Sequence, residues 1–264
     1  MLLIGERINA TREPVAKAFQ QRDEAFFIKE ARAQTQAGCD FIDLNCGTGT
    51  NEKELMAWLT TLLSKQNPTP FFFDSADAKV IEAGLSKVDE PQKHVCNSTP
   101  LDANRLSALL PIVREFGCKV VGLLMDERGI PKTAERRVEI AKKLLERFDA
   151  EGITPDRVFI DPIIEPIGVD ASRALLVIQC IQKLKPLIAP AQIVVSVSGV
   201  SFGLPKRKVL NRTFLPMLAA AGADALIADP LDKDLIATLT ATDALTNCDP
   251  YCLKYIQAYR SGKL

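Results

Sequence analysis

Short apolar runs recur along the chain, and longer amphipathic stretches separate them. Many of the runs end on Asp or Asn, as in "FIDLN", "FFFDS", "VCNST", "VFIDP" and "LIADP". Short runs rich in β-branched and aromatic residues are typical of buried strands. The pattern predicts strands at residues 2–5, 41–45, 70–74, 94–97, 119–125, 158–161, 193–198 and 225–228.

The amphipathic stretches between these runs have helical length and recognisable ends. "NEKELMAWLTTLLSK" begins at Asn51, a favourable N-cap, with Glu54 placed as its capping-box partner. "LDANRLSALLPIVREFG" and "KTAERRVEIAKKLLERFDAEG" stop at Gly117 and Gly152, as helices commonly do. The segments "AGCDFIDLN", "FGCKVVGLLM" and "AGADALIADP" repeat one plan, in which a helix end and a Gly precede a strand with a polar end.

Eight predicted strands that alternate with helices indicate a (β/α)8 TIM barrel. A doubly wound sheet is the alternative, and it would usually carry a glycine fingerprint after its first strand. "GERINATRE" has a single Gly at that place, which disfavours a dinucleotide site. No Pro/Ser-rich linker or low-complexity run divides the chain, so we expect one α/β domain over residues 1–264.

Charge and cysteine usage narrow the class of protein. Lys plus Arg and Asp plus Glu both number 33, and this neutral balance gives no reason to expect a nucleic-acid or membrane partner. The apolar run in "MLLIGERINA" is too short for a signal peptide or a membrane span, which favours the cytoplasm. The seven scattered Cys favour reduced thiols in the same compartment. Cys248 and Cys252 stand four residues apart, but a structural zinc would need two further ligands.

The single histidine limits the possible chemistry. His94 begins a predicted strand, so we place it at the bottom of the barrel, away from the site. The chain then has no partner for a Ser–His or Cys–His pair and no His cluster for zinc, and we expect no metal site. It also lacks a "GxxxxGK[ST]" phosphate loop. This set of residues fits chemistry that depends on positioning a bound organic cofactor.

In a barrel, the carboxyl ends of the strands face the active site. Pro162 favours an extended conformation at Asp161, which points that carboxylate out of the strand end, where it suits a ligand rich in N–H donors, such as an aminopyrimidine edge. Asn97 offers both a donor and an acceptor. Asp74 is either a binding group or the cap of the next helix, and each Asp can instead bond loop amides. The polar residues at the predicted ends are Glu6, Asn9, Asp43, Asn45, Asp74, Ser75, Asn97, Ser98, Asp126, Asp161, Ser198 and Asp229.

An ordered set of short motifs resembles the pterin-binding (β/α)8 family. The motifs are "IGERIN", "DLN", "DS", "IEAGL", "NST", "GIPK", "IDP", "NRTFL" and "IADP", and they span nearly the whole chain. Within that family the sequence is similar to the corrinoid-protein/tetrahydrofolate methyltransferases, in particular to the second methyltransferase of O-demethylase or betaine demethylation systems. The resemblance implies transfer of a methyl group between N5 of tetrahydrofolate and the cobalt of a corrinoid.

The resemblance also implies roles for residues and partners. Asp74, Asn97 and Asp161 match the pterin-contacting and catalytic positions, and Arg207 matches an arginine near the folate. The corrinoid-binding motif "DxHxxG" is missing, so the cobalamin is expected on a separate corrinoid protein. A homodimer is expected as well, with the C-terminal "CDPYCLKYIQAYRSGKL" helix either on the barrel or at the dimer face. The other residues of the expected folate site are Glu6, Asn9, Asn45, Ser198, Gly199, Phe202 and Ile227.

The segment "SGVSF" departs from the family pattern. Acetyl-CoA-pathway members carry "SNVSQ", so Gly199 replaces an Asn implicated in hydrogen bonding N5, and Phe202 replaces a Gln. A donor at N5 helps when N5 is the leaving group and is dispensable when N5 is the nucleophile. We therefore expect the direction that forms 5-methyltetrahydrofolate. The alternatives are a methyltetrahydrofolate to corrinoid iron-sulfur protein methyltransferase, a non-catalytic pterin-binding subunit, and a dihydropteroate synthase, whose lysine motif is missing from "SVSGVSFG".

Overall fold

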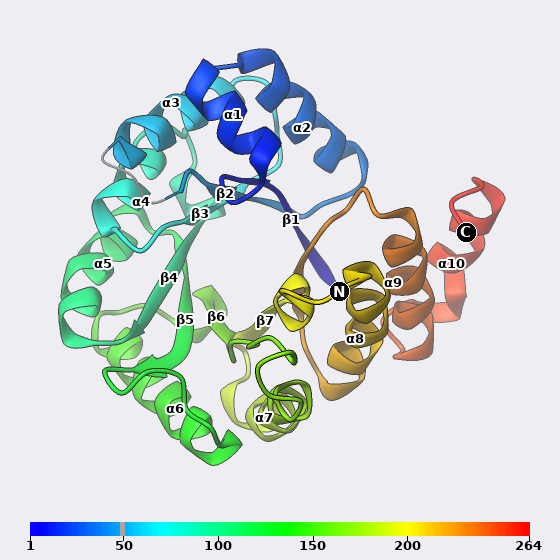
Figure 1. Ribbon diagram of the computed structural model, residues 1–264. Coiled ribbons are helices and arrows are strands. Elements are labelled where there is room, and N and C mark those ends of the chain that lie inside the picture. The colour runs from blue at the N-terminus through cyan, green and yellow to red at the C-terminus, as the bar shows by residue number, and fades with distance from the viewer. Residues whose placement is uncertain (48–50) are drawn as a thin grey trace.

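The computed structural model describes residues 1–47 and 51–264, and it forms a closed barrel of parallel strands (Figure 1). Each strand pairs with the next, and β1 closes the barrel by pairing Leu2 with Ala225 of β8. The predicted (β/α)8 fold is therefore confirmed. The strands are β1 (Leu2–Asn9), β2 (Phe41–Asn45), β3 (Phe71–Asp74), β4 (Val95–Leu101), β5 (Lys119–Asp126), β6 (Val158–Asp161), β7 (Gln192–Ser196) and β8 (Ala225–Ala228).

The helices surround the strands as an outer ring (Figure 1). Helix α10 lies outside this ring, against α9. Among the described residues, no helix is both long and apolar enough to cross a membrane. The α-helices are α1 (Glu13–Gln21), α2 (Glu24–Gln36), α3 (Glu52–Ser64), α4 (Ala78–Leu85), α5 (Ala103–Phe116), α6 (Ala134–Ala150), α7 (Arg173–Ile188), α8 (Arg207–Ala221), α9 (Lys233–Leu245) and α10 (Leu253–Arg260).

Two apolar layers stabilise the barrel, because successive side chains of a strand point to opposite faces. In β3, Phe72 belongs to the cluster inside the barrel, whereas Phe71 and Phe73 pack against the helices. Inside the barrel, the ring of Phe72 lies 5.0 Å from that of Phe41 and 5.5 Å from that of Phe159. The barrel is therefore filled with side chains, and a ligand has room only at its mouth.

Some predicted helix ends are confirmed and one is wrong. Gly117 ends α5 with φ of 65°, a left-handed conformation that glycine adopts without strain. Asn51 precedes α3 but makes no capping hydrogen bond with its side chain, so the predicted capping box is wrong. Glu54 instead pairs at 2.5 Å with Arg22, the residue that ends α1, because both side chains reach the surface. Asp77, rather than Asp74, caps α4.

The strands predicted at 2–5 and 94–97 extend further, to Asn9 and Leu101, whereas β7 ends early. The strand ends at Ser196 rather than at 198, and residues Val197–Ser201 form a short 3₁₀ helix, η3. The Val200 carbonyl accepts from the backbone of Ile167, so η3 bonds to the loop after β6 rather than to a neighbouring strand. This turn carries Ser198 and Gly199 over the barrel mouth.

Candidate active site at the barrel mouth

Acidic and amide side chains from neighbouring strands bond to one another at the mouth. The Asn45 amide donates to Asp74 at 2.8 Å, and the Asn97 amide donates to Asp43 at 3.1 Å. The strand register also places Asp74 beside Asn97. Since Asp77 caps the following helix, Asp74 is not needed as a cap and remains available to a ligand. The structure thus brings together Asn45, Asp74 and Asn97 as the sequence predicts.

Asp161 reaches the same mouth from β6, and its loop is firmly held. Its carboxylate accepts from the backbone of Ile163 at 2.7 Å, and Ile163 has a left-handed φ of 60°. The fully buried Arg137 of α6 donates to the carbonyls of Pro162 and Ile163 at 2.5 and 2.9 Å. A guanidinium that satisfies two loop carbonyls fixes the backbone next to Asp161. Arg137 is a positioning residue that sequence reasoning missed, because nothing in its helical neighbourhood marks it.

The carboxyl groups of the mouth share an unusual electrostatic environment. Burial raises the pKa of Glu6 to about 7 and that of Asp161 to about 6. Burial, followed by the nearby Asp74 carboxylate, raises the pKa of Asp43 well above its ordinary value, and burial raises the pKa of Asp74 too. Such a cluster favours a ligand that supplies N–H donors, because hydrogen bonds to a carboxylate stabilise its charged form. The described residues include no group of three or more His, Cys, Asp or Glu arranged to hold a metal ion.

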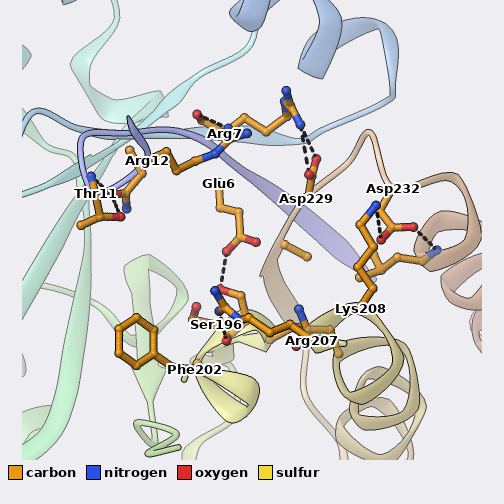
Figure 2. A pocket seen from close by; sticks show the side chains of 17 residues that line it. Glu6, Arg7, Thr11, Arg12, Ser196, Phe202, Arg207, Lys208, Asp229 and Asp232 are labelled. Carbon is orange, nitrogen blue, oxygen red and sulfur yellow. Dashed lines mark hydrogen bonds and ion pairs between the residues drawn. The ribbon is translucent and has the colours of Figure 1, made fainter. Parts of the chain in front are cut away.

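A cavity of about 390 Å³ continues the mouth between β1, η3 and the loop after β8 (Figure 2). Figure 2 shows Glu6 reaching across it from β1, with Phe202 and Arg207 on the other side. The hydroxyl of Ser198 donates to Glu6 at 2.8 Å. The Arg207 guanidinium donates to the Ser198 carbonyl at 2.8 Å and lies 5.6 Å from the centre of the Phe202 ring. Phe202 is 67% exposed, so this ring is free to meet a ligand or a partner at the mouth.

Two other predicted site residues are already engaged by the protein. Asn9 lines the cavity, but its amide oxygen accepts from both the backbone and the hydroxyl of Thr11, which closes the turn after β1. Ile227 is 9% exposed and packs in the cluster inside the barrel. These residues shape the turn and the inner layer below the cavity, and their contact with a folate stays a prediction.

Gly199 is crowded by the loop after β6. A Cβ at this position would lie 2.8 Å from Cγ2 of Ile164 and 3.3 Å from its carbonyl oxygen. Real Cβ atoms essentially never approach within 3.0 Å of another heavy atom, so any side chain here would displace Ile164. The glycine therefore has a packing reason of its own, which the sequence did not reveal.

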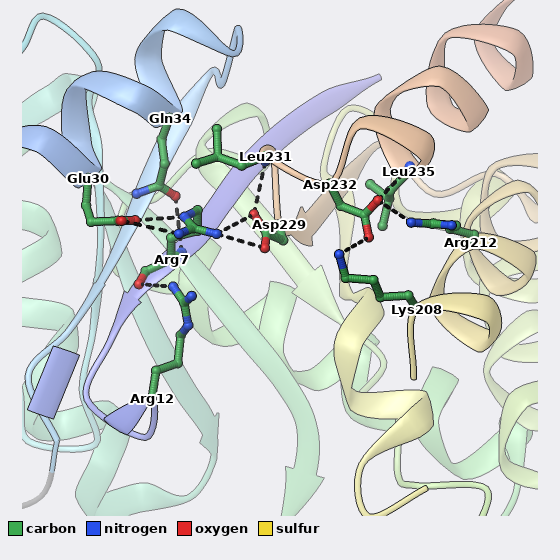
Figure 3. Close-up of polar contacts among 10 residues, drawn as sticks. All are labelled: Arg7, Arg12, Glu30, Gln34, Lys208, Arg212, Asp229, Leu231, Asp232 and Leu235. Carbon is green, nitrogen blue, oxygen red and sulfur yellow. Dashed lines mark hydrogen bonds and ion pairs between the residues drawn. The ribbon is translucent and has the colours of Figure 1, made fainter. Parts of the chain in front are cut away.

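Ion pairs support the far side of the cavity (Figure 3). Arg7 bridges Glu30 of α2 at 2.7 Å and Asp229 after β8 at 3.0 Å. Its carbonyl accepts from Arg12 at 2.6 Å. Asp232 binds Arg212 at 2.6 Å, and Lys208 lies 3.5 Å from it. This network ties β1, β8 and α8 together behind Glu6.

Asp43, like Arg137, is a residue of the mouth that the predicted folate site omitted. It is almost fully buried, and it accepts the hydrogen bond of Asn97 described above. The signal that could have found it is its place in "DLN", two residues before Asn45 and hence on the same face of β2.

A closed barrel with a mouth of carboxylates and amides defines a class of ligand-binding (β/α)8 enzyme scaffolds. Within this class, residues 5–229 match the family described as pterin binding enzyme, and the chain belongs to that family. The resemblance predicted from the short motifs is therefore confirmed.

Curated relatives lie within the same family. The methylcorrinoid:tetrahydrofolate methyltransferase of Eubacterium limosum is 32% identical over 267 residues, which covers 100% of this chain and 98% of that protein. The methionine synthases of Mycobacterium leprae and Mycobacterium tuberculosis are 31% and 30% identical over 241 residues. These matches cover 86% of this chain but only 20% of each synthase.

Solved structures agree in fold at low identity. A dihydropteroate synthase of Yersinia pestis with a pterine-sulfa conjugate has a TM-score of 0.66 at 13% identity, over 93% of this chain and 94% of that one. The dihydropteroate synthase of Coxiella burnetii in complex with pteroic acid has a TM-score of 0.68 at 16% identity, over 94% of both chains. At these identities the likeness shows the barrel fold alone.

Proposed function

We propose that this protein is a methyltransferase that moves a methyl group from a methylated corrinoid protein to N5 of tetrahydrofolate. The observation that carries the proposal is the 32% identity with the methylcorrinoid:tetrahydrofolate methyltransferase of Eubacterium limosum over essentially the full length of both chains. The acidic and amide mouth supports it independently, because its acceptors suit the N–H and NH2 groups of a pterin.

In this proposal, Asp74, Asn97 and Asp161 hold the pterin edge, and Asn45 orients Asp74. The remaining residues of the proposed folate site are Glu6, Asn9, Ser198, Gly199, Phe202, Arg207 and Ile227. The protein positions N5 so that its lone pair faces the methyl carbon in line with the bond to cobalt. A bond forms between N5 and carbon, the carbon–cobalt bond breaks, its electron pair stays on cobalt as Co(I), and the N5 proton must leave. The corrinoid is cargo of the partner protein, which docks over the mouth.

The proposed direction forms 5-methyltetrahydrofolate. Its supports are the name of the methylcorrinoid:tetrahydrofolate methyltransferase of Eubacterium limosum, in which the methylcorrinoid stands first, and the missing N5 donor at Gly199. The missing donor at Gly199 is the weaker of the two supports. The contact with Ile164 also requires a small residue at 199, whatever the direction of the reaction.

The reaction is tested by mixing the protein with tetrahydrofolate and methylcob(III)alamin, free or on a corrinoid protein. The proposal expects loss of the methylcobalamin spectrum that depends on both the protein and the folate. Binding of tetrahydrofolate without turnover in either direction would instead support the non-catalytic pterin-binding subunit. Faster demethylation of methyltetrahydrofolate under matched conditions would overturn the proposed direction.

We also propose a homodimer in the cytoplasm. Exposed apolar side chains of the C-terminal segment support a contact between copies, since Tyr251, Leu253 and Tyr259 are exposed and α10 buries none of its residues in the chain. Sedimentation equilibrium of the full chain tests the dimer. A monomer at all concentrations used for the assay would overturn it.

A further inference from the structure

The proposed reaction leaves one proton without an acceptor. Tetrahydrofolate carries a hydrogen on N5, and the methylated product does not, so a base must take this proton once N5 bonds to the methyl carbon. The proposed pterin contacts are poor candidates. One oxygen of Asp161 accepts from Ile163, and one oxygen of Asp74 accepts from Asn45. Their remaining acceptor capacity is used by the N–H groups of the aminopyrimidine in the proposed function.

The shape of a pterin points to the other side of the mouth. Its amino-pyrimidine ring and its N5-bearing ring are the two ends of one flat bicyclic system. With the pyrimidine held by β3, β4 and β6, the N5 end extends across the mouth toward β1 and η3. Glu6 and Ser198 meet there, joined by the hydrogen bond of 2.8 Å, and Gly199, which has no side chain, follows Ser198 in the lining of the cavity.

The surroundings of Glu6 suit a group that exchanges a proton. Only its Oε2 accepts a hydrogen bond from a described residue, and the carboxyl group lines the 390 Å³ cavity. The groups that face it are Ser198 of η3, Asp229 after β8, Arg207 of α8, Arg12 after β1 and Asp43 of β2. Burial and the Asp229 carboxylate raise its pKa to about 7, against the lowering effects of Ser198 and the two arginines. A base with a pKa near the working pH is the effective one.

We propose that Glu6 is the catalytic residue that accepts the N5 proton of tetrahydrofolate during methyl transfer, and that Ser198 is its positioning residue. The inference rests on the proposed function. The N5 lone pair forms the bond to carbon, the carbon–cobalt electron pair remains on cobalt, and the N5–H electron pair becomes the nitrogen lone pair as the proton moves to a carboxylate oxygen of Glu6. In the reverse direction, protonated Glu6 returns the proton to N5.

The decisive experiment is the pH profile of methylcob(III)alamin consumption with tetrahydrofolate for the wild type and Glu6→Gln. The wild-type rate is expected to rise through a midpoint near pH 7 as Glu6 loses its proton. Glu6→Gln, which cannot accept a proton, is expected to lose about 10²-fold or more in kcat and to lose the midpoint. The affinity for tetrahydrofolate, measured by calorimetry, is expected to fall far less than kcat.

Ser198→Ala provides a second and milder variant. It removes a hydrogen bond that stabilises the carboxylate, so the midpoint is expected to move to higher pH while the limiting rate at alkaline pH is largely kept. Glu54→Gln, on the exposed face of α3, is the matched control and is expected to match the wild type.

The outcomes separate the two proposals. A wild type that turns over in neither direction contradicts the proposed function itself. An active wild type whose pH midpoint persists in Glu6→Gln and does not move in Ser198→Ala overturns the inference alone. A Glu6→Gln variant that loses affinity for tetrahydrofolate in the same proportion as its rate also overturns it, because Glu6 then contributes to folate binding alone and not to proton transfer.

Discussion

At the scale of single residues, the mouth pairs carboxylates with amides rather than with cations. The amides of Asn45 and Asn97 each donate to one carboxyl oxygen, of Asp74 and Asp43 respectively. The second oxygen of each carboxyl group stays open to a ligand. In the described part of the chain, none of the carboxyl groups of Glu6, Asp74 and Asp161 belongs to an ion pair. A ligand rich in N–H donors would therefore supply the hydrogen bonds that these carboxylates do not receive from the protein.

The first prediction concerns Asp161. Above its pKa of about 6, the carboxylate accepts hydrogen bonds from the ligand, and below it the proton competes with them. We expect the affinity for tetrahydrofolate to fall as the pH drops below about 6. Asp161→Asn should weaken binding about 10- to 100-fold at pH 7.5, the scale of one charged hydrogen bond. Calorimetric titration checks both effects.

The control for this prediction is Asp170→Asn. Asp170 belongs to the same loop but caps a turn at Ser172 at the exposed rim of the barrel. It should bind tetrahydrofolate like the wild type. Equal affinity of Asp161→Asn and the wild type at pH 7.5 would show that Asp161 does not contact the pterin.

The second prediction concerns Gly199. Gly199→Asn should lower the free energy of unfolding by about 1–3 kcal/mol, because the new side chain meets Ile164. Ile164→Ala in the same chain removes the methyl group that clashes and should recover part of this loss. Urea unfolding of the two single variants and the double variant measures the coupling.

The double variant is also the fair test of direction. With the clash removed, an Asn at position 199 should speed demethylation of methyltetrahydrofolate relative to the forward reaction, because it can donate to the departing N5. Initial rates in both directions, compared with Ile164→Ala alone, decide the point. Rates that change equally in both directions would disprove the directional role of residue 199.

At the scale of elements, the sequence predicts the strands better than the connections after them. The buried runs are visible because a parallel strand is apolar on both faces, and "VFIDP" and "FIDLN" give β6 and β2 their observed ends. The turn from β7 into η3 was not predictable, since "VSVSGVS" is small and apolar in either conformation. Its shape depends on hydrogen bonds from Ile167 and Arg207. Both residues lie outside the short run of sequence from which a strand is predicted.

The same limit applies to the site. The strand-end rule finds Asp74, Asn97 and Asp161 because parallel strands of a barrel all end at one mouth. It does not find the raised pKa of Glu6, which depends on burial and on charged groups from other segments, or the bonds of Arg137 to the loop after β6, which come from the outer side of the barrel. Such properties come from tertiary packing, which a local pattern does not contain.

The third prediction concerns the link between α6 and the loop after β6. Arg137→Met removes the donor to two loop carbonyls and one partner of Glu165, and we expect a loss of roughly 3 kcal/mol or more in unfolding free energy. The affinity for tetrahydrofolate should fall as well, since the loop positions Asp161. Arg136→Met, on the exposed side of the same turn, should cost less than about 1 kcal/mol. Equal losses in both variants would contradict this role of Arg137.

At the scale of the whole molecule, the C-terminal helix stands apart from the barrel. It lies outside the ring of helices in Figure 1, against α9, and Asp249 accepts from the backbones of Lys254 and Tyr255 at its start, both at 3.0 Å. Several large apolar side chains of this segment are exposed to solvent, which supports the proposed contact with a second copy.

The fourth prediction is the effect of removing residues 253–264. We expect the truncated protein to remain folded with a nearly unchanged circular dichroism spectrum, because α10 contributes no buried residue. In sedimentation equilibrium it should have the mass of one chain, whereas the full chain forms the proposed dimer. A truncated protein that remains a dimer would place the contact between copies elsewhere on the barrel.

The fifth prediction joins the mouth to the stability of the whole fold. In the folded chain the pKa values of Glu6 and Asp161 lie above their ordinary values of 4.5 and 3.8. Between about pH 4 and 7, these two groups therefore hold more protons in the folded state than in the unfolded state. The contribution of these two groups to the free energy of unfolding therefore falls as the pH rises through this window, by roughly 3 kcal/mol for Glu6 alone. His94 acts in the opposite direction, because burial lowers its pKa to about 4. Urea unfolding at pH 5 and pH 8 measures the difference.

The variant Glu6→Gln/Asp161→Asn should show a much smaller fall, because neither amide titrates. Saturating tetrahydrofolate should restore part of the wild-type stability at pH 8, since its N–H groups bind the charged carboxylates of the folded chain and not those of the unfolded one. A double variant whose stability changes between pH 5 and pH 8 as much as that of the wild type would contradict the raised pKa values. The protein would then already stabilise the charged carboxylates of the mouth. A ligand rich in N–H donors would no longer be needed to explain their arrangement.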